Sequence, residues 1–145
     1  MDEDVDYKVS YATRKLISLE WTNSYYGHGA AHGFGDISVK NEVLLLCLHQ
    51  LTGQDVFRSD EDQIVGLRRL FQNALKKQGW VPRDGQDDIE ILEIVQRYDK
   101  WSFSTEGLTV SFNSYDGGCY ACTPQPLTVP WSELRPLLAD DAVVP

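Results

Sequence analysis

Two histidines in a short glycine-rich segment are the first residues of this sequence that suggest chemistry. His28 and His32 lie in the run 27–33, which otherwise holds only glycine and alanine. Two imidazoles form part of a zinc site when a third ligand joins them and a position stays open. Carboxylate or imidazole groups nearby in sequence could be that ligand: Glu20, Asp36 or His49. The spacing of four residues would put both imidazoles on one face of a helix. The glycines predict a loop instead, where the spacing does not determine how the two rings are placed. The structural alternative is that His32 hydrogen-bonds the backbone of a tight turn.

Other catalytic signatures are absent from the sequence. It contains no G-x-S-x-G nucleophile motif, and no glycine-rich phosphate loop precedes a helix. Runs of carboxylates such as Asp87-Asp88 are typical of solvated surface. We therefore expect no catalytic residue and no cofactor, with a metal site at His28 and His32 as the enzymatic alternative.

Tyrosines in polar surroundings indicate a binding surface rather than a reaction centre. Tyrosine is enriched where one end of the ring is apolar and the other wet, as at protein interfaces. We expect a partner-binding face made by the loops 27–33 and 113–126. Its candidate residues are Tyr25, Tyr26, His28, His32, Tyr115, Asp116 and Tyr120. The alternative is that the rings only cap the ends of a sheet.

The charge balance narrows the class of partner. Asp and Glu number 22 against 13 Lys and Arg, a formal net charge of −9. Nucleic acids and anionic membranes need clustered basic residues, so both are disfavoured. A negative surface favours a basic protein and a fast, salt-dependent encounter with it. No run reaches the roughly 18 apolar residues of a membrane span.

Three cysteines are too few for a disulfide scaffold. Cys119 and Cys122 form a C-x-x-C motif between glycines and prolines, which predicts a loop. The spacing leaves open two free thiols or a local disulfide. Cys47 lies in the apolar run 43–48 and is expected to be a buried core thiol.

Apolar residues at period two predict strands, most clearly over 16–26. A second long strand is expected over 37–50. Its half 43–48 is apolar on both faces and should be a central strand covered on both sides. The segment 89–95 is ambiguous between helix and strand. Shorter strands are expected at 6–12, 98–104, 108–112 and 127–129.

The clearest helix is predicted over 60–78. Ser59 is its N-cap candidate, and Gly79 suits the position after its end. Apolar residues at helical spacing predict the face packed on the core: Ile64, Leu67, Leu70, Phe71, Ala74 and Leu75. A short helix follows Pro130 and ends near Leu138.

This order of elements predicts an α+β fold. We expect an antiparallel sheet of about five to six strands, with the long amphipathic helix on one face and a short C-terminal helix. A length of 145 residues fits a single domain, 1–145. The start Met1-Asp2-Glu3-Asp4 carries no basic or apolar leader, so a cytoplasmic location is expected if Met1 is native.

The order of short motifs resembles a bacterial family of unknown function. Its domain ends the lysozyme-sensing anti-sigma-V factor and accompanies some peptidoglycan deacetylases. The family pattern is Gly-Gly-Ala-His-Gly, then a leucine-lysine-threonine-glycine hairpin, then an isoleucine-proline-tyrosine-serine-glutamate-leucine end. The likeness runs over about 16–138. The matching motifs here are Gly29-Ala30-Ala31-His32-Gly33, Leu51-Thr52-Gly53 and Val129-Pro130-Trp131-Ser132-Glu133-Leu134.

The resemblance implies an α+β module of the cell envelope that binds a protein, in one branch the strongly basic lysozyme. Ala30 and Trp131 depart from the family glycine and tyrosine, and the cysteine pair lies in a loop that is usually cysteine-free. The implied role is recognition, and neutralisation as by an inhibitor or immunity protein, of a cationic bacteriolytic enzyme or toxin. The alternative is a metal-dependent cell-wall enzyme or accessory domain using His28 and His32. The implied location is the cell envelope or periplasm if a leader was removed.

Overall fold

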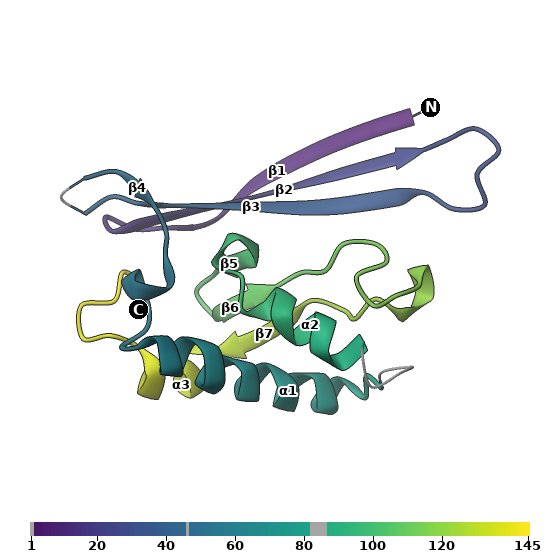
Figure 1. Ribbon diagram of the computed structural model, residues 1–145. Helices are drawn as coiled ribbons and strands as arrows, with labels where there is room; N and C mark the ends of the chain where they lie inside the picture. Colours follow the sequence, from purple (N-terminus) through teal and green to yellow (C-terminus); the bar gives the residue numbers. More distant parts are fainter. Residues whose placement is uncertain (1, 46, 82–86) are drawn as a thin grey trace.

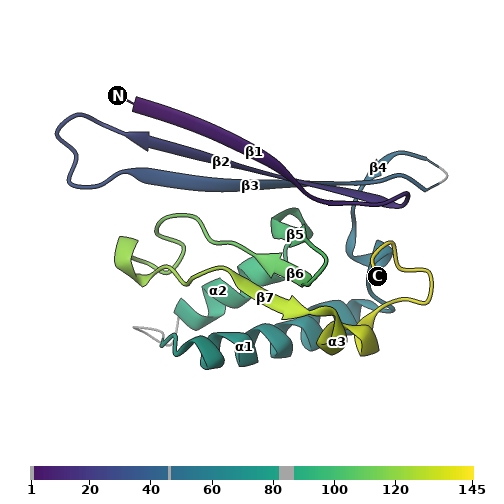
Figure 2. The same cartoon turned by 180° about the vertical axis from the view of Figure 1, so that it is seen from behind.

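The computed structural model describes residues 2–45, 47–81 and 87–145 and shows an α+β fold in three layers. A sheet of four strands forms one outer layer, a sheet of three strands lies in the middle, and helices cover the far side (Figures 1 and 2). The predicted fold class is confirmed, including the long helix packed on a sheet. The strands divide between two antiparallel sheets, where the sequence suggested one.

The first sheet is a long meander with strand order β1-β2-β3-β4. β2 covers the predicted residues 16–26, and its partners on both sides are antiparallel. A glycine-rich loop, 27–33, joins β2 to β3 at the end far from the core (Figure 1). The strands are β1 (Asp2–Ala12), β2 (Leu16–Tyr26), β3 (Phe34–Val43) and β4 (His49–Gln50).

The second sheet, β5-β6-β7, is short and mostly buried. A Cβ at Gly107 would collide with the carbonyl oxygen of Val129, so only glycine permits this close approach of β6 to β7. The strands are β5 (Trp101–Phe103), β6 (Gly107–Val110) and β7 (Leu127–Pro130).

The long helix begins and ends as its sequence signals indicate. The Ser59 hydroxyl accepts from the backbone N–H of Asp62 at 3.1 Å, and Gly79 ends the helix at φ 73°. Its first turn has π geometry, so Ile64 rotates off the apolar stripe and is 47% exposed, against the prediction. The π turn covers Asp62–Gly66, and the α-helices are α1 (Leu67–Gln78), α2 (Asp87–Val95) and α3 (Trp131–Leu134). Single 3-10 turns cover Gly53–Asp55, Tyr98–Lys100, Tyr120–Cys122 and Arg135–Leu137.

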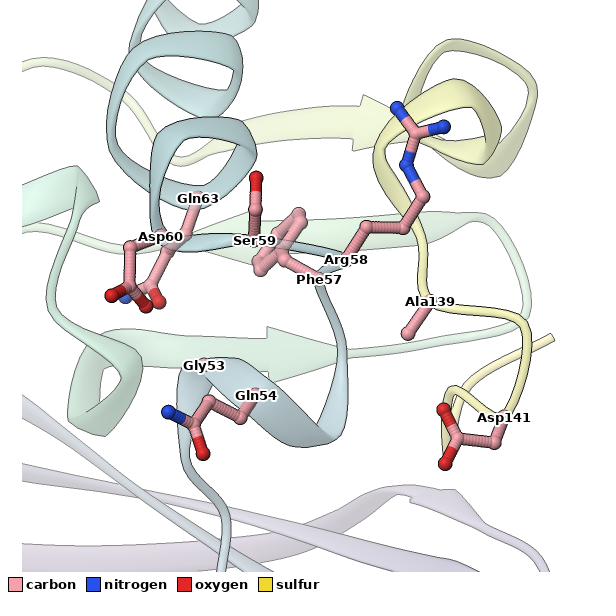
Figure 3. A pocket seen from close by; sticks show the side chains of 9 residues that line it. All are labelled: Gly53, Gln54, Phe57, Arg58, Ser59, Asp60, Gln63, Ala139 and Asp141. Atoms are coloured by element: carbon pink, nitrogen blue, oxygen red, sulfur yellow. The ribbon is translucent and has the colours of Figure 1, made fainter.

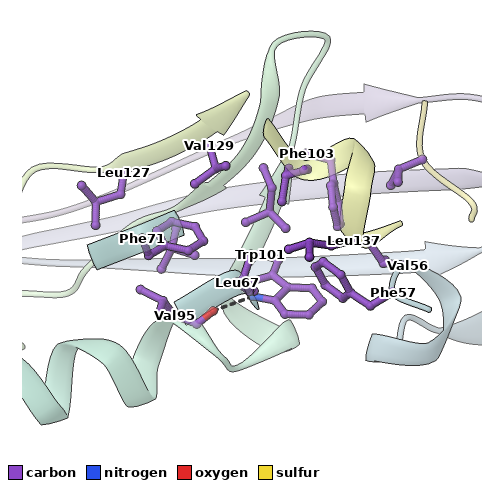
Figure 4. Packing of buried hydrophobic residues seen from close by; sticks show 14 of the residues in the cluster. Val56, Phe57, Leu67, Phe71, Val95, Trp101, Phe103, Leu127, Val129 and Leu137 are labelled. Atoms are coloured by element: carbon purple, nitrogen blue, oxygen red, sulfur yellow. Dashed lines mark hydrogen bonds between the residues drawn. The ribbon is translucent and has the colours of Figure 1, made fainter. Parts of the chain in front are cut away.

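The core lies between the small sheet and the helices, with Leu16 of β2 and Val43 of β3 added from the long sheet, and Trp101 is among its largest fully buried side chains (Figure 4). The indole N–H of Trp101 donates to the Val95 carbonyl at 2.9 Å, and its ring meets Phe57 edge-on at 5.3 Å. A buried indole needs such a partner for its N–H. No helix in the described ranges has the length and apolarity needed to cross a membrane.

The two sheets are joined by hydrogen bonds that involve side chains, and they do not form one continuous sheet. Asn41 of β3 donates to the Trp101 carbonyl at 2.6 Å, and the Phe103 N–H donates to the Ser18 hydroxyl at 3.3 Å. The Ser102 hydroxyl reaches the Glu20 carboxylate at 2.8 Å. The bonds from Asn41 and to Ser18 satisfy backbone groups of β5 that a neighbouring strand would otherwise pair, and the bond between Ser102 and Glu20 joins two side chains.

The segment 43–48 is not a covered central strand. β3 ends at Val43, and the chain then turns outward, leaving Leu45 at 39% and Leu48 at 70% exposure. Cys47 is a free, exposed thiol rather than a core residue. Leu46 falls outside the described residues. The sequence pattern could not predict that this segment is exposed, because a short apolar run has no periodicity that distinguishes a buried strand from a surface turn.

Leucine truncations at two sites should separate the true core from this apolar turn. Leu108→Ala, at a fully buried β6 position, should lower the free energy of unfolding by about 2–5 kcal/mol. Leu48→Ala should change it by no more than about 0.5 kcal/mol, since that side chain is already in water. Urea denaturation measures both. A large loss at Leu48 would contradict the surface assignment.

Candidate functional site

The loop 113–126 is fixed against the free edge of β3 by two polar side chains. The backbone N–H of Ile37 donates to the Asn113 side-chain oxygen at 2.9 Å. The Ser114 hydroxyl donates to the Gly35 carbonyl at 3.2 Å. These side chains bond the edge as a neighbouring strand would, so the loop lies beside the β2–β3 hairpin.

A tight turn then directs Tyr115 toward the hairpin. The Asp116 carboxylate accepts from the Asn113 N–H at 2.6 Å, and the Gly118 N–H donates to the Tyr115 carbonyl at 2.8 Å. Tyr115 has φ 74°, a left-handed conformation that is unfavourable for a side chain of this size. Asp116, predicted as a contact residue, therefore acts in the first place as a turn-forming residue.

Five rings from the hairpin and the loop pack into one aromatic cluster. His32 stacks on Tyr120, with ring centroids 4.1 Å apart and planes 19° apart. Phe34 stacks on Tyr25 at 5.6 Å and contacts Tyr115 at 5.4 Å. Tyr115 and Tyr120 meet edge-on at 5.9 Å. The aromatic cluster is Tyr25, His32, Phe34, Tyr115 and Tyr120.

Both ring nitrogens of His32 have partners, one in the backbone of the loop and one in the cluster. Nδ1 lies 3.3 Å from the Gly33 carbonyl, and Nε2 lies 3.3 Å from the Tyr115 hydroxyl. A carbonyl only accepts, so Nδ1 is the donor in the first contact, while a tyrosine hydroxyl can either donate to Nε2 or accept from it. The bonding confirms the structural reading of His32 in a turn and adds a tyrosine that sequence spacing could not supply.

Cys119 and Cys122 form a disulfide, which resolves the alternatives left by their spacing. The bridge closes the turn that carries Tyr120, and the Cys122 carbonyl accepts from the Trp80 indole at 3.0 Å. A Cβ at Gly117 would collide with the same carbonyl oxygen, so glycine lets the loop fold back on itself.

A hollow of about 250 Å³ adjoins the cluster at the outer end of the long sheet. Carboxylates of β1 and aromatic rings of the hairpin line it together. The Tyr26 hydroxyl donates to the Ala30 carbonyl at 2.7 Å, so that ring also supports the loop. The lining residues are Asp2, Glu3, Asp4, Ser24, Tyr25, Tyr26, Gly33 and Phe34.

The ligands considered for a metal site lie apart. Glu20 pairs with Lys8 at 2.9 Å, and His49 pairs with Asp55 at 3.1 Å near β4. His28 is exposed in the loop. Among the described residues no group of three or more His, Cys, Asp or Glu side chains could hold an ion.

A larger hollow of about 510 Å³ lies at the opposite end of the molecule, near the start of the long helix (Figure 3). Its polar groups serve the helix cap: the Ser59 hydroxyl donates to Asp62 at 3.1 Å, and Arg58 pairs with the same carboxylate at 3.3 Å. It holds none of the predicted site residues.

The comparisons with known proteins identify the family. A family model described as a protein of unknown function, DUF3298, matches residues 54–132, more than half of the chain. The chain belongs to the DUF3298 family. The family resemblance seen in the sequence is thereby confirmed, and the match contains Tyr115 and Tyr120 but not the hairpin half of the cluster.

Two solved structures share the fold. A DUF3298 family member from Bacteroides fragilis has 20% sequence identity and a TM-score of 0.68 over 96% of this chain. A DUF3298 family protein from Pseudomonas aeruginosa has 16% identity and a TM-score of 0.65 over 99% of this chain. The chain corresponds to 55% and 64% of those two longer chains. No match was found among curated proteins.

Sequence reasoning found four of the five rings and missed Phe34. Phe34 stands between two glycines, and its importance depends on lying directly opposite Tyr25 in the β2–β3 pair. The sequence did contain an indication of this contact. If 27–33 is the loop of a hairpin, residues on its two sides, such as Tyr25 and Phe34, pair across the two strands.

The His49–Asp55 pair gives the fold a pH dependence of known sign. The hydrogen bond to Asp55 raises the pKa of His49 above its usual value, and the Cys47 carbonyl adds to the effect. A pKa raised by folding stabilises the protein fully below the unfolded-state pKa of about 6.5. That contribution is lost as the pH rises through the folded-state pKa.

Replacing the histidine should therefore matter most in mild acid. The wild type should exceed His49→Gln in unfolding free energy by more at about pH 5.5 than at about pH 9. Urea denaturation at both pH values measures the difference. In a parallel NMR titration, Asp55→Asn should lower the pKa of His49. A difference that stays constant or grows with pH would contradict the sign.

Proposed function

We propose that this domain binds a basic protein through the aromatic cluster and the adjoining acidic hollow, and catalyses no reaction itself. The partner class is a cationic bacteriolytic hydrolase or toxin, and binding would recognise or neutralise it. The observation that carries the proposal is the ordered packing of Tyr25, His32, Phe34, Tyr115 and Tyr120 beside three carboxylates of β1.

The cluster has the properties of a contact surface. Tyr115 is 40%, Tyr120 47% and Phe34 39% exposed although all three contact other rings of the cluster. Rings that are already held in place lose little freedom when a partner covers them, so more of the contact energy appears as affinity. Tyrosine is also enriched among the residues that dominate interface energies.

Charge selects the kind of partner. The hollow beside the cluster contains Asp2, Glu3 and Asp4 and no basic side chain. With a net charge of −9 the domain attracts cations at a distance, and the tyrosine hydroxyls accept hydrogen bonds at short range. A lysine or arginine of the partner therefore fits the hollow, and its apolar neighbours fit the rings.

The location and the inhibitory role rest on separate support. A disulfide such as Cys119–Cys122 persists in oxidising compartments, which favours the cell envelope or the periplasm. Neutralisation of a hydrolase is what the resemblance to the lysozyme-sensing domain implies.

Calorimetric titration with a basic lysozyme at low salt tests the proposal. We expect a saturable heat that weakens as salt screens the attraction. Tyr120→Ala should weaken binding by about tenfold or more if the ring is an anchor. Tyr98→Ala is the matched control, because Tyr98 is 45% exposed against 47% for Tyr120 but lies outside the cluster.

A second control keeps the fold of the partner and removes its charge. Lysozyme with acetylated lysines should bind much more weakly. Absence of heat with the unmodified enzyme at low salt, or equal binding by Tyr120→Ala and wild type, would refute the proposal.

A further inference from the structure

The first strand is an open sheet edge. β1 stands at the end of the strand order and pairs with β2, with one register shift between Val9 and Tyr11. Residues 2–9 are all exposed. One side of β1 therefore has no neighbouring strand in the described structure along 11 residues, which is longer than the usual edge strand. One backbone group there already has a partner, because the Tyr7 N–H donates to the Asp6 carboxylate at 2.9 Å.

The side chains of β1 sort into two chemically different rows. Direct pairing places Tyr7 opposite Trp21 and Val9 opposite Leu19, so these side chains share the outer face of the sheet. Val5, Tyr7 and Val9 are 59%, 79% and 57% exposed, and Trp21 adds a ring at 37%. From Val5 to Val9 the outer row is thus an apolar stripe in water, and Glu3 continues the row toward the N-terminal end of β1.

The opposite row is acidic. Lys8 pairs with Glu20, and Glu20 also contacts Ser102 of the small sheet, which marks this as the inner face. Asp2, Asp4 and Asp6 fall on the same face by the period of two. Lys8 is already neutralised by Glu20. None of the ion pairs in the described part of the chain involves the three aspartates.

From this edge we infer that β1 is a template for β-augmentation: an extended segment of the basic partner pairs with it as an added strand. The inference rests on the proposed function and names how the partner is held. The added strand must alternate cationic and apolar residues, because directly opposed residues share a face. Its Lys or Arg side chains meet Asp2, Asp4 and Asp6, and its apolar side chains meet Val5, Tyr7 and Val9.

The edge and the candidate site form one continuous surface. Glu3 of β1 lies directly opposite Tyr25, and Asp2 and Asp4 line the hollow next to Phe34. A strand laid along β1 would therefore end beside this hollow, with β1 and β2 between it and Phe34 of β3. Backbone hydrogen bonds would give affinity along the strand, and the cluster would contact what lies beyond it.

A second copy of the chain is a less suitable partner for the β1 edge than a basic strand. Two β1 strands would bring eight carboxylates, two each of Asp2, Glu3, Asp4 and Asp6, onto one strand pair of molecules that each carry −9. Like charges on neighbouring strands are destabilising. Carboxylates on an exposed edge are also a known device against self-pairing.

The test uses a blocked seven-residue peptide that alternates lysine and valine, titrated into the intact protein. We expect saturable binding, and slowed hydrogen exchange of β1 amides measured by NMR, because those amides gain partners. A peptide of the same composition with its lysines and valines in blocks is the periodicity control. It should bind at least about tenfold more weakly and leave β1 exchange unchanged.

Matched variants separate local pairing from general attraction. Asp4→Asn with Asp6→Asn removes two charges from the edge and should weaken peptide binding about five- to thirtyfold. Asp140→Asn with Asp141→Asn removes the same charge from exposed positions near the C-terminus and should leave affinity within about twofold. Tyr7→Thr keeps a strand-forming residue and should also weaken binding.

The outcomes are distinct. Three results would overturn the inference. The first is equal binding of both peptides, and the second is an equal loss of affinity in both charge variants. The third is sedimentation as a dimer whose β1 amides are protected before peptide is added. Peptide binding at β1 without any heat from lysozyme would leave the edge as a strand-binding site and remove lysozyme as its partner. Lysozyme binding that Tyr120→Ala weakens, with no peptide effect at β1, would keep the proposed function and reject the edge.

Discussion

Backbone N–H and C=O groups at the edge of a strand need hydrogen-bond partners, and the arrangement of this domain depends on how they find them. In the described part of the chain, two stretches of strand edge are bonded by side chains and not by a neighbouring strand: the end of β3 nearest the 27–33 loop, and the edge of β5 that faces the long sheet. Asn113 and Ser114 bond the first, and Asn41 and Ser18 bond the second. An unpaired group in such a place would cost about 1–3 kcal/mol, so the bonds fix both position and register. The loop carrying Tyr115 and Tyr120 is thereby held against the hairpin.

Sequence patterns predicted the parts of the fold that local rules control. Alternation placed β2 at 16–26, and cap chemistry placed Ser59 and Gly79 at the ends of the long helix. These features need only a few neighbouring residues. The division into two sheets was not predictable in this way, since it depends on side chains such as Asn41 meeting β5, 60 residues further along the chain.

The errors have a common physical origin. Cys47 and Ile64 are apolar or weakly polar residues whose neighbours in sequence suggest burial, and both are exposed. A turn after Val43 and a single π turn after Glu61 rotate them outward. A small change in the rotation of the backbone moves a side chain from the core to the solvent, although the amino-acid composition of the segment stays the same. In the candidate site, four of the five rings could be named from their residue type and polar neighbours in the sequence. Phe34 and the packing of the rings could not, because they depend on the contact between the hairpin and the loop.

The geometry of Tyr115 indicates what the site is built to do. A non-glycine residue at φ 74° costs about 1 kcal/mol or more, and the surrounding contacts maintain it: the Asp116 carboxylate, the Gly118 N–H and the His32 ring. A ring needed only to cover a sheet edge could use an ordinary backbone conformation. Here the strain orients Tyr115 between Phe34 and Tyr120 while it stays 40% exposed. The proposed binding of a partner would benefit from this arrangement, because rings that are already held in place need less ordering on binding.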